Sequence, residues 1–360
     1  MSAARYPAIG AHGLIGDRRT AALVSADGTI DWSCLPQFDG DIVFGALLDG
    51  TRGGRWRLGP RQALEGEQQY LDETALLLTR WTLPEWEVEL LDAMLLPDDA
   101  ADQPQSPALL RRLRCARGVC PCIMELGPRL NFAAAVPVGH DTASGRDTPG
   151  AALHLWTSRQ EVAASTDENG GSEFELREGD ELWTVLSWGS APQPPWRLED
   201  ARAALERTAS SWRHWARLHP WMGPQRRPVL ASQRVIRLLS DAQNSSQVAA
   251  PTTSLPERIG GDRNYDYRFA WVRDSPLALA ILAVFGDLET AEHYMDWLAG
   301  RPPGDEMPLK LLYRIDGPAR PGSGTSRTSR DTGARARCAS ATTRPSSSSL
   351  TRSAISPTAR

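Results

Sequence analysis

Lysine is almost absent from this chain of 360 residues: Lys310 is the only one, and the other 39 basic residues are arginine. Such a bias is typical of GC-rich coding DNA rather than of a particular function. A large excess of charge of one sign is also lacking, because 40 basic and 44 acidic residues leave a formal net charge of −4. A nucleic-acid-binding protein usually has a basic face or stripe, so no nucleic-acid partner is expected.

Long apolar runs are missing as well. A transmembrane helix needs about eighteen or more apolar residues in succession, and the sequence contains no such run. The N-terminal stretch MSAARYPAIGAHGLIGD lacks the apolar core of a signal peptide. We therefore expect a cytoplasmic protein with no membrane partner.

Cysteine is scarce, with five residues at Cys34, Cys115, Cys120, Cys122 and Cys338. Cys120-Pro-Cys122 with Cys115 nearby offers a metal-binding alternative, but a structural zinc site normally takes four ligands. The surrounding sequence alternates like a strand, which places Cys120 and Cys122 on one face as small buried side chains. With no phosphate-binding glycine loop either, neither a metal nor another cofactor is expected.

Short apolar runs separated by turn signals fill residues 1–195. The dipeptide Asp27-Gly28 lies between AALVS and TIDWSCL, and Asp-Gly between two alternating runs is a strong hairpin signal. Many such runs with no helical periods between them predict an antiparallel β-sandwich.

The periodicity changes near residue 196. Apolar residues then recur at three- and four-residue steps from Leu198 to Trp215, which predicts an amphipathic helix whose stripe packs against a neighbouring domain. Prolines and glycines between residues 220 and 228 interrupt the chain. Further helices are predicted over 229–243 and 274–300, and Gly286 is expected to split the second one.

A loop rich in aromatic and charged residues, 249–275, lies between these helices. Tyr265, Tyr267, Phe269 and Trp271 alternate, which would place them on one side of an extended segment. Arg273 and Asp274 follow them. Two interpretations remain open from the residues alone. In the first, Asp274 or Ser275 caps the next helix. In the second, the segment binds a sugar: the aromatic rings stack on the pyranose faces, and Arg273 and Asp274 form hydrogen bonds with the hydroxyl groups.

The sequence IGGDRNYDYRFAWVRDS at 259–275 strongly resembles the hallmark of glycoside hydrolase family fifteen, the bacterial glucoamylase and trehalase family. PTTSLPE upstream agrees with it, and so do HGLIGDRRTAALVSADGTIDWSCLPQFDGDIVFGALLD and RRLRCARGV…ELGPRLNF in the first half. The resemblance covers about residues 6–320. It implies an α+β multidomain protein in which an N-terminal β-sandwich precedes an (α/α)6 barrel.

The resemblance also implies a function and a set of binding residues. Tyr267 and Trp271 would form the wall of a subsite for the non-reducing glucose, and Arg273 and Asp274 would bind its hydroxyls. The expected substrate is a sugar with α-linked glucose: an α-glucan, an α-glucoside or trehalose. Family members use an inverting acid/base mechanism with two Glu residues, both from parts of the barrel beyond this motif. No catalytic residue is therefore expected in this chain.

The tail, residues 321–360, differs from the rest. Ser, Thr, Arg and Ala fill thirty of its forty positions. The tail contains seven Arg and one Asp, so it carries a formal charge of +6, and residues 1–320 carry −10. Such a segment cannot form a packed core. A disordered basic tail for an anionic partner is one interpretation. A shifted reading frame is the one we favour, because regrouped codons from Thr325 can spell a continuation similar to the family's next block.

These observations predict a domain plan. It consists of a trehalase-like β-sandwich at 1–195, a linker helix and loop at 196–228, an incomplete (α/α)6 glycosidase domain at 229–320, and a disordered or out-of-frame tail at 321–360. The alternative function is a non-catalytic carbohydrate-binding or scaffold protein.

Other candidate side chains carry weaker signals. Turn or capping roles are expected for Asp17, Asp31 and Asp39. Glu257 and Asp262 have no acid or base role implied by the resemblance. His12 and His140 lack the Ser or Cys nucleophile of a catalytic triad.

Overall fold

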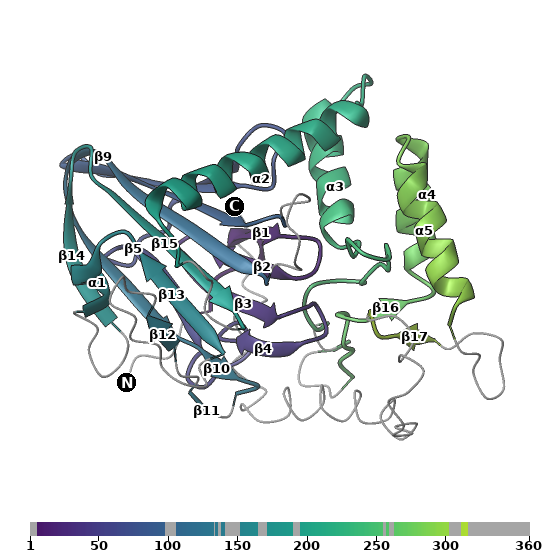
Figure 1. Ribbon diagram of the computed structural model, residues 1–360, viewed down its shortest axis with the longest axis horizontal. Helices are drawn as coiled ribbons and strands as arrows, with labels where there is room; N and C mark the ends of the chain where they lie inside the picture. The colour runs from purple at the N-terminus through teal and green to yellow at the C-terminus, as the bar shows by residue number, and fades with distance from the viewer. Residues whose placement is uncertain are drawn as a thin grey trace. The chain divides into compact units, whose positions relative to one another are not determined.

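The first half of the chain folds around one long strand, β9 (Ala108–Gly127), in the computed structural model of the protein (Figure 1). The structure describes residues 6–97, 106–132, 134–135, 138–140, 152–164, 171–189, 195–254, 257–258, 263–301 and 311–315. Contacts divide the chain into two units. The first consists of Met1–Pro36 and Gly40–Arg217, and the second of Gln37–Asp39 and Leu218–Arg360.

Most strands of the first unit are short, as the closely spaced turn signals predict. They are β1 (His12–Gly16), β2 (Ala21–Ser25), β3 (Thr29–Leu35), β4 (Asp41–Phe44), β5 (Arg55–Pro60), β6 (Glu67–Tyr70), β7 (Leu77–Thr82), β8 (Trp86–Met94), β10 (Arg129–Leu130), β11 (Ala134–Ala135), β12 (Val138–His140), β13 (Leu153–Thr157), β14 (Gly171–Arg177) and β15 (Glu181–Trp188). A 3-10 turn, η1 (Ile9–Ala11), and a short helix, α1 (Gln160–Ala164), interrupt them. Described neighbours pair antiparallel except β12 and β13, which are parallel. The predicted antiparallel β domain is confirmed.

The strand β9 takes part in both layers of this domain. Its first half pairs with β8 and β15, and its second half pairs with β5 and β14. The direction changes at Gly118, whose φ of 75° and whose close approach to the Glu85 carbonyl leave no room for a side chain. Thirteen strands consequently form one continuous sheet rather than two separate ones, a feature that local patterns in the sequence do not predict.

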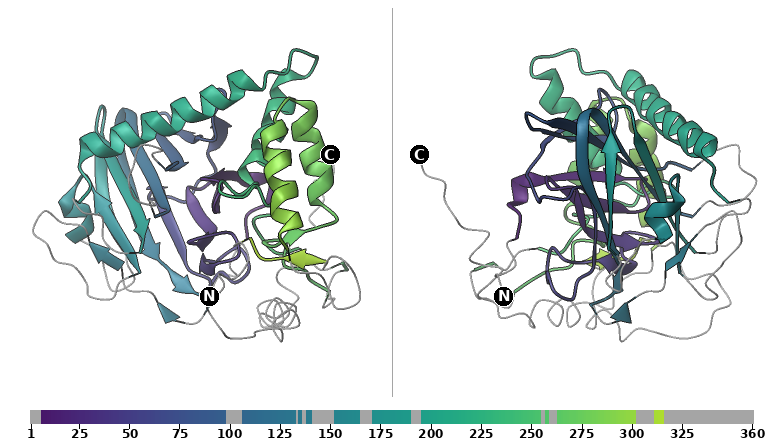
Figure 2. Two further views of the ribbon diagram at one scale, coloured as in Figure 1. Left: turned by 45° about the vertical axis from the view of Figure 1, so that its right-hand side comes forward. Right: turned by 90° about the vertical axis from the view of Figure 1, so that its left-hand side faces the viewer.

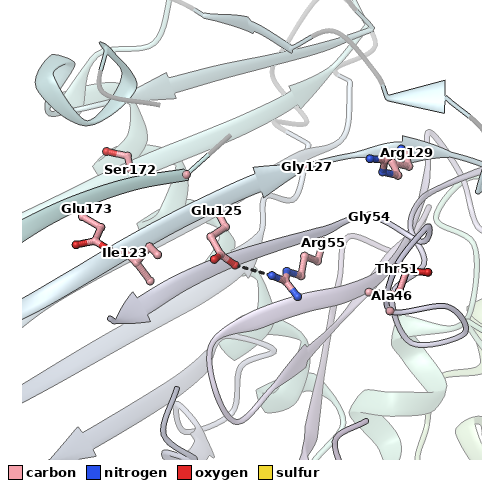
Figure 3. A pocket seen from close by; sticks show the side chains of 12 residues that line it. Ala46, Thr51, Gly54, Arg55, Ile123, Glu125, Gly127, Arg129, Ser172 and Glu173 are labelled. Atoms are coloured by element: carbon pink, nitrogen blue, oxygen red, sulfur yellow. Dashed lines mark hydrogen bonds and ion pairs between the residues drawn. The ribbon is translucent and has the colours of Figure 1, made fainter. Parts of the chain in front are cut away.

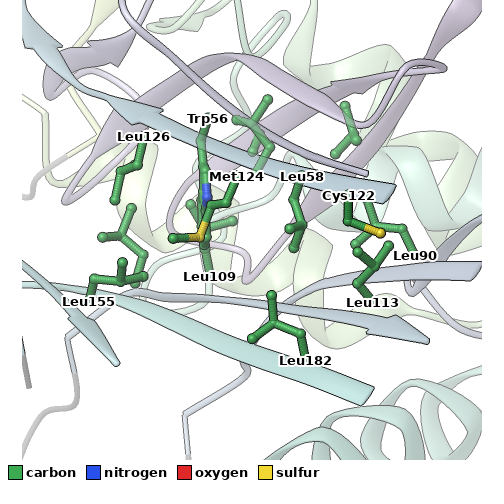
Figure 4. Close-up of a cluster of buried hydrophobic side chains, with 14 of the residues drawn as sticks. Trp56, Leu58, Leu90, Leu109, Leu113, Cys122, Met124, Leu126, Leu155 and Leu182 are labelled. Atoms are coloured by element: carbon green, nitrogen blue, oxygen red, sulfur yellow. The ribbon is translucent and has the colours of Figure 1, made fainter. Parts of the chain in front are cut away.

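The core of this domain lies between the two halves of β9. Figure 4 shows Met124 and Leu126 on one layer, facing Leu109 and Leu155 on the other. All four side chains are 9% exposed or less. Apolar residues thus alternate along β9 toward the core, and the intervening residues face outward.

The hairpin predicted at Asp27-Gly28 is confirmed. It joins β2 to β3, and Gly28 has the positive φ, 81°, that the turn requires. The Gly28 carbonyl accepts a hydrogen bond of 2.7 Å from the buried Arg111 guanidinium on β9. This bond ties the turn to the centre of the sheet.

The long helix α2 (Leu198–Leu218) follows the strands and has the predicted periodicity. Its residue Thr208 is buried, and the hydroxyl accepts a 3.1 Å hydrogen bond from the Leu96 amide after β8. Arg202 lies over the buried ring of Trp183 on β15, 5.6 Å from its centroid. These contacts tie α2 to the strands of the first unit, and the buried residues of its apolar stripe, among them Leu205, Ala209 and Trp212, belong to the same unit.

Three helices dominate the described part of the second unit: α3 (Arg226–Leu238), α4 (Ser275–Val284) and α5 (Leu288–Ala299). Gly286, with a φ of 92°, separates α4 from α5 as predicted, and the two helices lie side by side (Figure 2). The Arg237 guanidinium on α3 pairs with Asp287 at 2.9 Å. Since Asp287 also caps α5 through the Thr290 amide, this ion pair fixes the start of α5 against α3.

The tail at residues 321–360 lies outside the described residues. Among the residues that the structure describes, no helix has the length and apolar character needed to cross a membrane.

Candidate functional site

The hallmark segment lies against the chain that precedes it. Within the second unit, the Ser254 amide donates to the Tyr265 carbonyl at 2.8 Å, and the Ala250 amide donates to the Tyr267 carbonyl at 3.0 Å. Further along, β16 (Ala270–Trp271) pairs antiparallel with β17 (Leu312–Tyr313). The loop predicted at 249–275 is therefore held in place by backbone hydrogen bonds on both sides.

A turn between Asp266 and Trp271 shapes this segment. The guanidinium of Arg268 donates two hydrogen bonds to the Asp266 carboxylate, of 2.9 and 2.7 Å. The Trp271 indole N–H donates to the Asp266 carbonyl at 2.9 Å. Arg268 and Asp266 are nearly buried, with 13% and 10% of their side chains exposed, so the bidentate pair holds the turn rigidly.

The turn brings the aromatic residues together in a different way from the one expected. The prediction of an extended segment with all four rings on one side is wrong, because the backbone turns at residues 267–269. Instead, Tyr265 and Tyr267 both meet the ring of Trp271 edge to face, at centroid distances of 6.1 and 6.0 Å. Trp271 is only 5% exposed, so it supports the two half-buried tyrosines from beneath.

Arg273 and Asp274 are the charged residues on the surface of this cluster. The Arg273 guanidinium donates to both oxygens of Asp274, at 3.2 and 3.1 Å, and lies 5.6 Å from the centroid of the Trp271 ring. The hydrogen bond and the charge of Asp274 raise the pKa of Arg273, which stays protonated. The two side chains are 66% and 39% exposed, so a ligand can reach both.

The capping interpretation of Asp274 is wrong for its side chain. Asp274 occupies the position before α4, yet its carboxylate makes no hydrogen bond to the helix. Ser275 is the first residue of the helix, and its hydroxyl donates to the Trp271 and Gln247 carbonyls at 3.0 and 3.2 Å. The carboxylate of Asp274 is thus directed to Arg273 and the solvent.

The cluster consequently offers donors and acceptors beside aromatic rings. A guanidinium only donates hydrogen bonds and a carboxylate only accepts them, so Arg273 and Asp274 together match a group that does both, such as a sugar hydroxyl. Tyr265 is engaged elsewhere, because its hydroxyl donates to Glu257 at 2.9 Å. All four residues predicted for the site, Tyr267, Trp271, Arg273 and Asp274, are brought together by the structure.

Asp266 and Arg268 are missing from the residues that sequence reasoning singled out. Both lie between the predicted aromatic residues, and neither is implied as a sugar contact. The sequence signal for this turn was an acidic residue and an arginine two residues apart in an irregular segment, because such a pair can form an ion pair across a turn. Asp262, by contrast, lies outside the described residues.

The weaker candidates of the first unit have structural partners. Asp17 accepts hydrogen bonds from the Arg19 and Thr20 amides, which confirms its turn role. Asp31 instead lies inside β3 and accepts a 2.8 Å hydrogen bond from His12 Nε2, so the turn or capping role expected for it is wrong. Burial and hydrogen bonding hold this His–Asp pair, whose side chains are each 5% exposed.

The cysteines occupy the core as the alternation predicts. Cys115, Cys120 and Cys122 have no exposed surface, and Cys34 is 2% exposed. Cys115, Cys120 and Cys122 are free thiols, and burial raises the pKa of Cys115. Within the described part of the chain, no group of His, Cys, Asp and Glu has the arrangement of a metal site.

Two family profiles match the sequence. The profile described as trehalase-like, N-terminal matches residues 1–146, and that of glycosyl hydrolases family 15 matches residues 232–336. The second match contains the whole cluster described above.

Curated relatives agree with these matches. The chain is 28% identical over 343 residues to a trehalase of Mycolicibacterium smegmatis, which covers 87% of this chain and 50% of that protein. It is 27% identical over 342 residues to a trehalase of Mycobacterium tuberculosis, with 87% and 49% covered. For a trehalase of Thermoplasma volcanium the identity is 28% over 328 residues, with 86% and 50% covered. The chain thus spans about half the length of the curated relatives it matches. Residues 1–146 are thus similar to trehalase-like N-terminal domains, and residues 232–336 are similar to glycosyl hydrolases family 15.

Proposed function

We propose that this chain supplies the glucose-binding wall of a glycoside hydrolase of the trehalase type, which acts in carbohydrate metabolism on a sugar with terminal α-linked glucose. Three trehalases with 27–28% identity support this assignment. Trehalose, an α-glucan or another α-glucoside fits the proposal equally well.

One observation carries the proposal: the Asp274 carboxylate does not cap α4 but forms a surface pair with Arg273. In the proposed complex, Arg273 donates to hydroxyl oxygens of the glucose and Asp274 accepts from its hydroxyl hydrogens. Tyr267 forms the wall beside them. Trp271 supports this wall and keeps the Arg273 guanidinium in place from below, since its ring lies 5.6 Å from Arg273.

The proposed reaction is an inverting hydrolysis in an (α/α)6 barrel, of which α3, α4 and α5 are the first helices. In such a reaction a carboxylic acid protonates the leaving oxygen, and a carboxylate about 6.5–9.5 Å away activates a water molecule on the opposite face of the sugar. We propose that neither group is among these 360 residues. Arg273 and Asp274 hold the glucose and take no part in the proton transfers.

Calorimetric titration of the chain with trehalose and with maltose tests the proposal, combined with an assay for released glucose. We expect at least one of the sugars to bind with no glucose release above background. Failure of both sugars to bind would overturn the binding role. Appreciable turnover that disappears in Asp274→Ala would overturn the claim that the acid and base are absent.

A further inference from the structure

The first unit contains a pocket with a volume of about 630 Å³, formed on the outer side of β5, β9 and β14 (Figure 3). The loop between β4 and β5 closes one side of it through Ala46, Gly50 and Thr51. A volume of this size lies in the range of small-molecule binding sites. None of the hallmark residues that the structure describes, 249–254, 257–258 and 263–275, lines the pocket, so it is a separate place on the molecule.

At Gly127 the floor of the pocket is bare backbone. In β9, Leu126 and Met124 face the core, so Gly127, Glu125 and Ile123 alternate with them on the pocket side. A Cβ atom at Gly127 would meet no atom within 4 Å, and the φ of Gly127 is outside the left-handed range. Neither packing nor backbone geometry requires glycine at this position. Its effect is to leave open the space beside Arg55, its partner in the register of β5 and β9.

Charged side chains of both signs stand along this floor. Figure 3 shows Glu173 at one end, Arg129 at the other and the Arg55–Glu125 pair between them, 3.0 Å apart. Arg55 is 52% exposed and Glu125 is 28% exposed. Among the lining residues that the structure describes, two guanidinium groups and two carboxylates sum to a formal charge of zero, so together they attract neither anions nor cations over a distance.

The chemistry of these four groups selects the kind of ligand. The arginines only donate and the glutamates only accept hydrogen bonds. An anion would bind the arginines but be repelled by the two carboxylates. A cation would bind the carboxylates but be repelled by the two arginines. Arg55 and Glu125 already pair with each other, and Glu173 pairs with Arg61 at 3.1 Å. A neutral ligand with many hydroxyl groups suits the remaining donor and acceptor positions of all four lining groups, because each hydroxyl both donates and accepts. The apolar side chain of Ile123 and the bare strand at Gly127 then suit the C–H faces of sugar rings.

We propose that this pocket is a second saccharide-binding site, which holds a neutral disaccharide or oligosaccharide of α-linked glucose without acting on it. The choice of α-linked glucose rests on the proposed function, whereas the preference for a neutral polyhydroxylated ligand rests on the pocket. The N-terminal domain then contributes its own affinity for the substrate class and retains the sugar near the chain.

The substitution Gly127→Val fills the floor of the pocket and tests this proposal. Valine suits an outward strand position, so the thermal midpoint of the first unit should not fall. Val119→Ile is the matched control, because Val119 lies on the same face of β9, is 44% exposed and is outside the lining. Binding is measured by titration with trehalose and maltose in an Arg273→Ala, Asp274→Ala background, which removes the proposed glucose wall.

In that background we expect one remaining sugar site, weakened at least about tenfold, or 1.4 kcal/mol, by Gly127→Val and unchanged by Val119→Ile. A background chain that binds neither sugar would overturn the second site and leave the proposed function intact. Equal affinity with and without Gly127→Val would also overturn it. Binding of the zwitterionic dipeptide glycylglycine in place of the sugars would overturn the proposed ligand class.

Discussion

The guanidinium of Arg111 lies 2.7 Å from the Asp92 carboxylate, and neither side chain has any exposed surface. Arg111 also donates to the Trp56 carbonyl at 2.8 Å and to the Gly28 carbonyl at 2.7 Å. One residue of β9 therefore joins β8, β5 and the first hairpin inside the core. The pair organises the domain that precedes the proposed sugar-binding segment.

We expect Arg111→Leu to destabilise the first unit by about 3–5 kcal/mol, because it leaves the buried Asp92 carboxyl and two backbone carbonyls without their hydrogen-bond donor. Urea denaturation followed by circular dichroism measures this loss. The control is Arg177→Leu, whose side chain is 75% exposed in its pair with Glu175. Its effect should stay below about 1 kcal/mol, and similar losses for the two variants would contradict the role of Arg111.

The buried His12–Asp31 pair makes stability depend on pH. Burial alone would lower the pKa of His12, but the hydrogen bond and charge of Asp31, with the Ile9 and Ala8 carbonyls, raise it above 6.5. Burial raises the pKa of Asp31 as well. A folded-state pKa above the unfolded one stabilises the protein at low pH, and this contribution disappears as the pH rises through the folded pKa.

We therefore expect the free energy of unfolding to fall as the pH rises above about 6.5, and to fall more steeply in the wild type than in His12→Gln, which has no imidazole to titrate. Denaturant titrations at several pH values provide the comparison. If the free energy of unfolding changed with pH in the same way in both proteins, the His12–Asp31 pair would not contribute to the pH dependence of stability.

Gly286 connects α4 to α5, and substituting it tests whether this turn requires glycine. Its φ of 92° disfavours any side chain, although a Cβ there would touch nothing within 4 Å. Gly286→Ala should cost about 1–2 kcal/mol through the backbone alone. Gly300 after α5 has a φ of −78°, so Gly300→Ala should be neutral or stabilising. Thermal denaturation of both variants separates the two effects, and equal midpoints would contradict the assignment.

Local sequence patterns predicted the elements better than their connections. Asp27-Gly28 and Gly286 marked real turns, because only a few residue types adopt a positive φ without strain. The passage of β9 through both layers was not predictable, since its pairing partners lie far away in the sequence. For the candidate site, the family hallmark identified a segment in which the structure brings the four predicted residues together, but the turn at 267–269 depends on the non-adjacent pairing of Asp266, Arg268 and Trp271.

This turn provides a prediction about positioning. Arg268→Lys cannot form the two-pronged contact with Asp266, so Trp271 and the tyrosines should lose their fixed arrangement. We expect a weaker near-ultraviolet circular dichroism signal and weaker sugar binding. Arg263→Lys is the control, because Arg263 pairs with Glu257 at 3.4 Å and is 75% exposed. Equal spectra and affinities for the two variants would refute the positioning role.

The affinity of the hallmark segment for α-linked glucose is the central claim, and it is tested most directly in the Gly127→Val chain, where the pocket of the first unit is filled. Titration with trehalose and maltose should detect binding that Asp274→Asn weakens about tenfold or more, as expected for loss of a charged hydrogen-bond acceptor. Asp200→Asn, in the first turn of α2, should leave the affinity unchanged. The same affinity with and without Asp274→Asn would contradict the account.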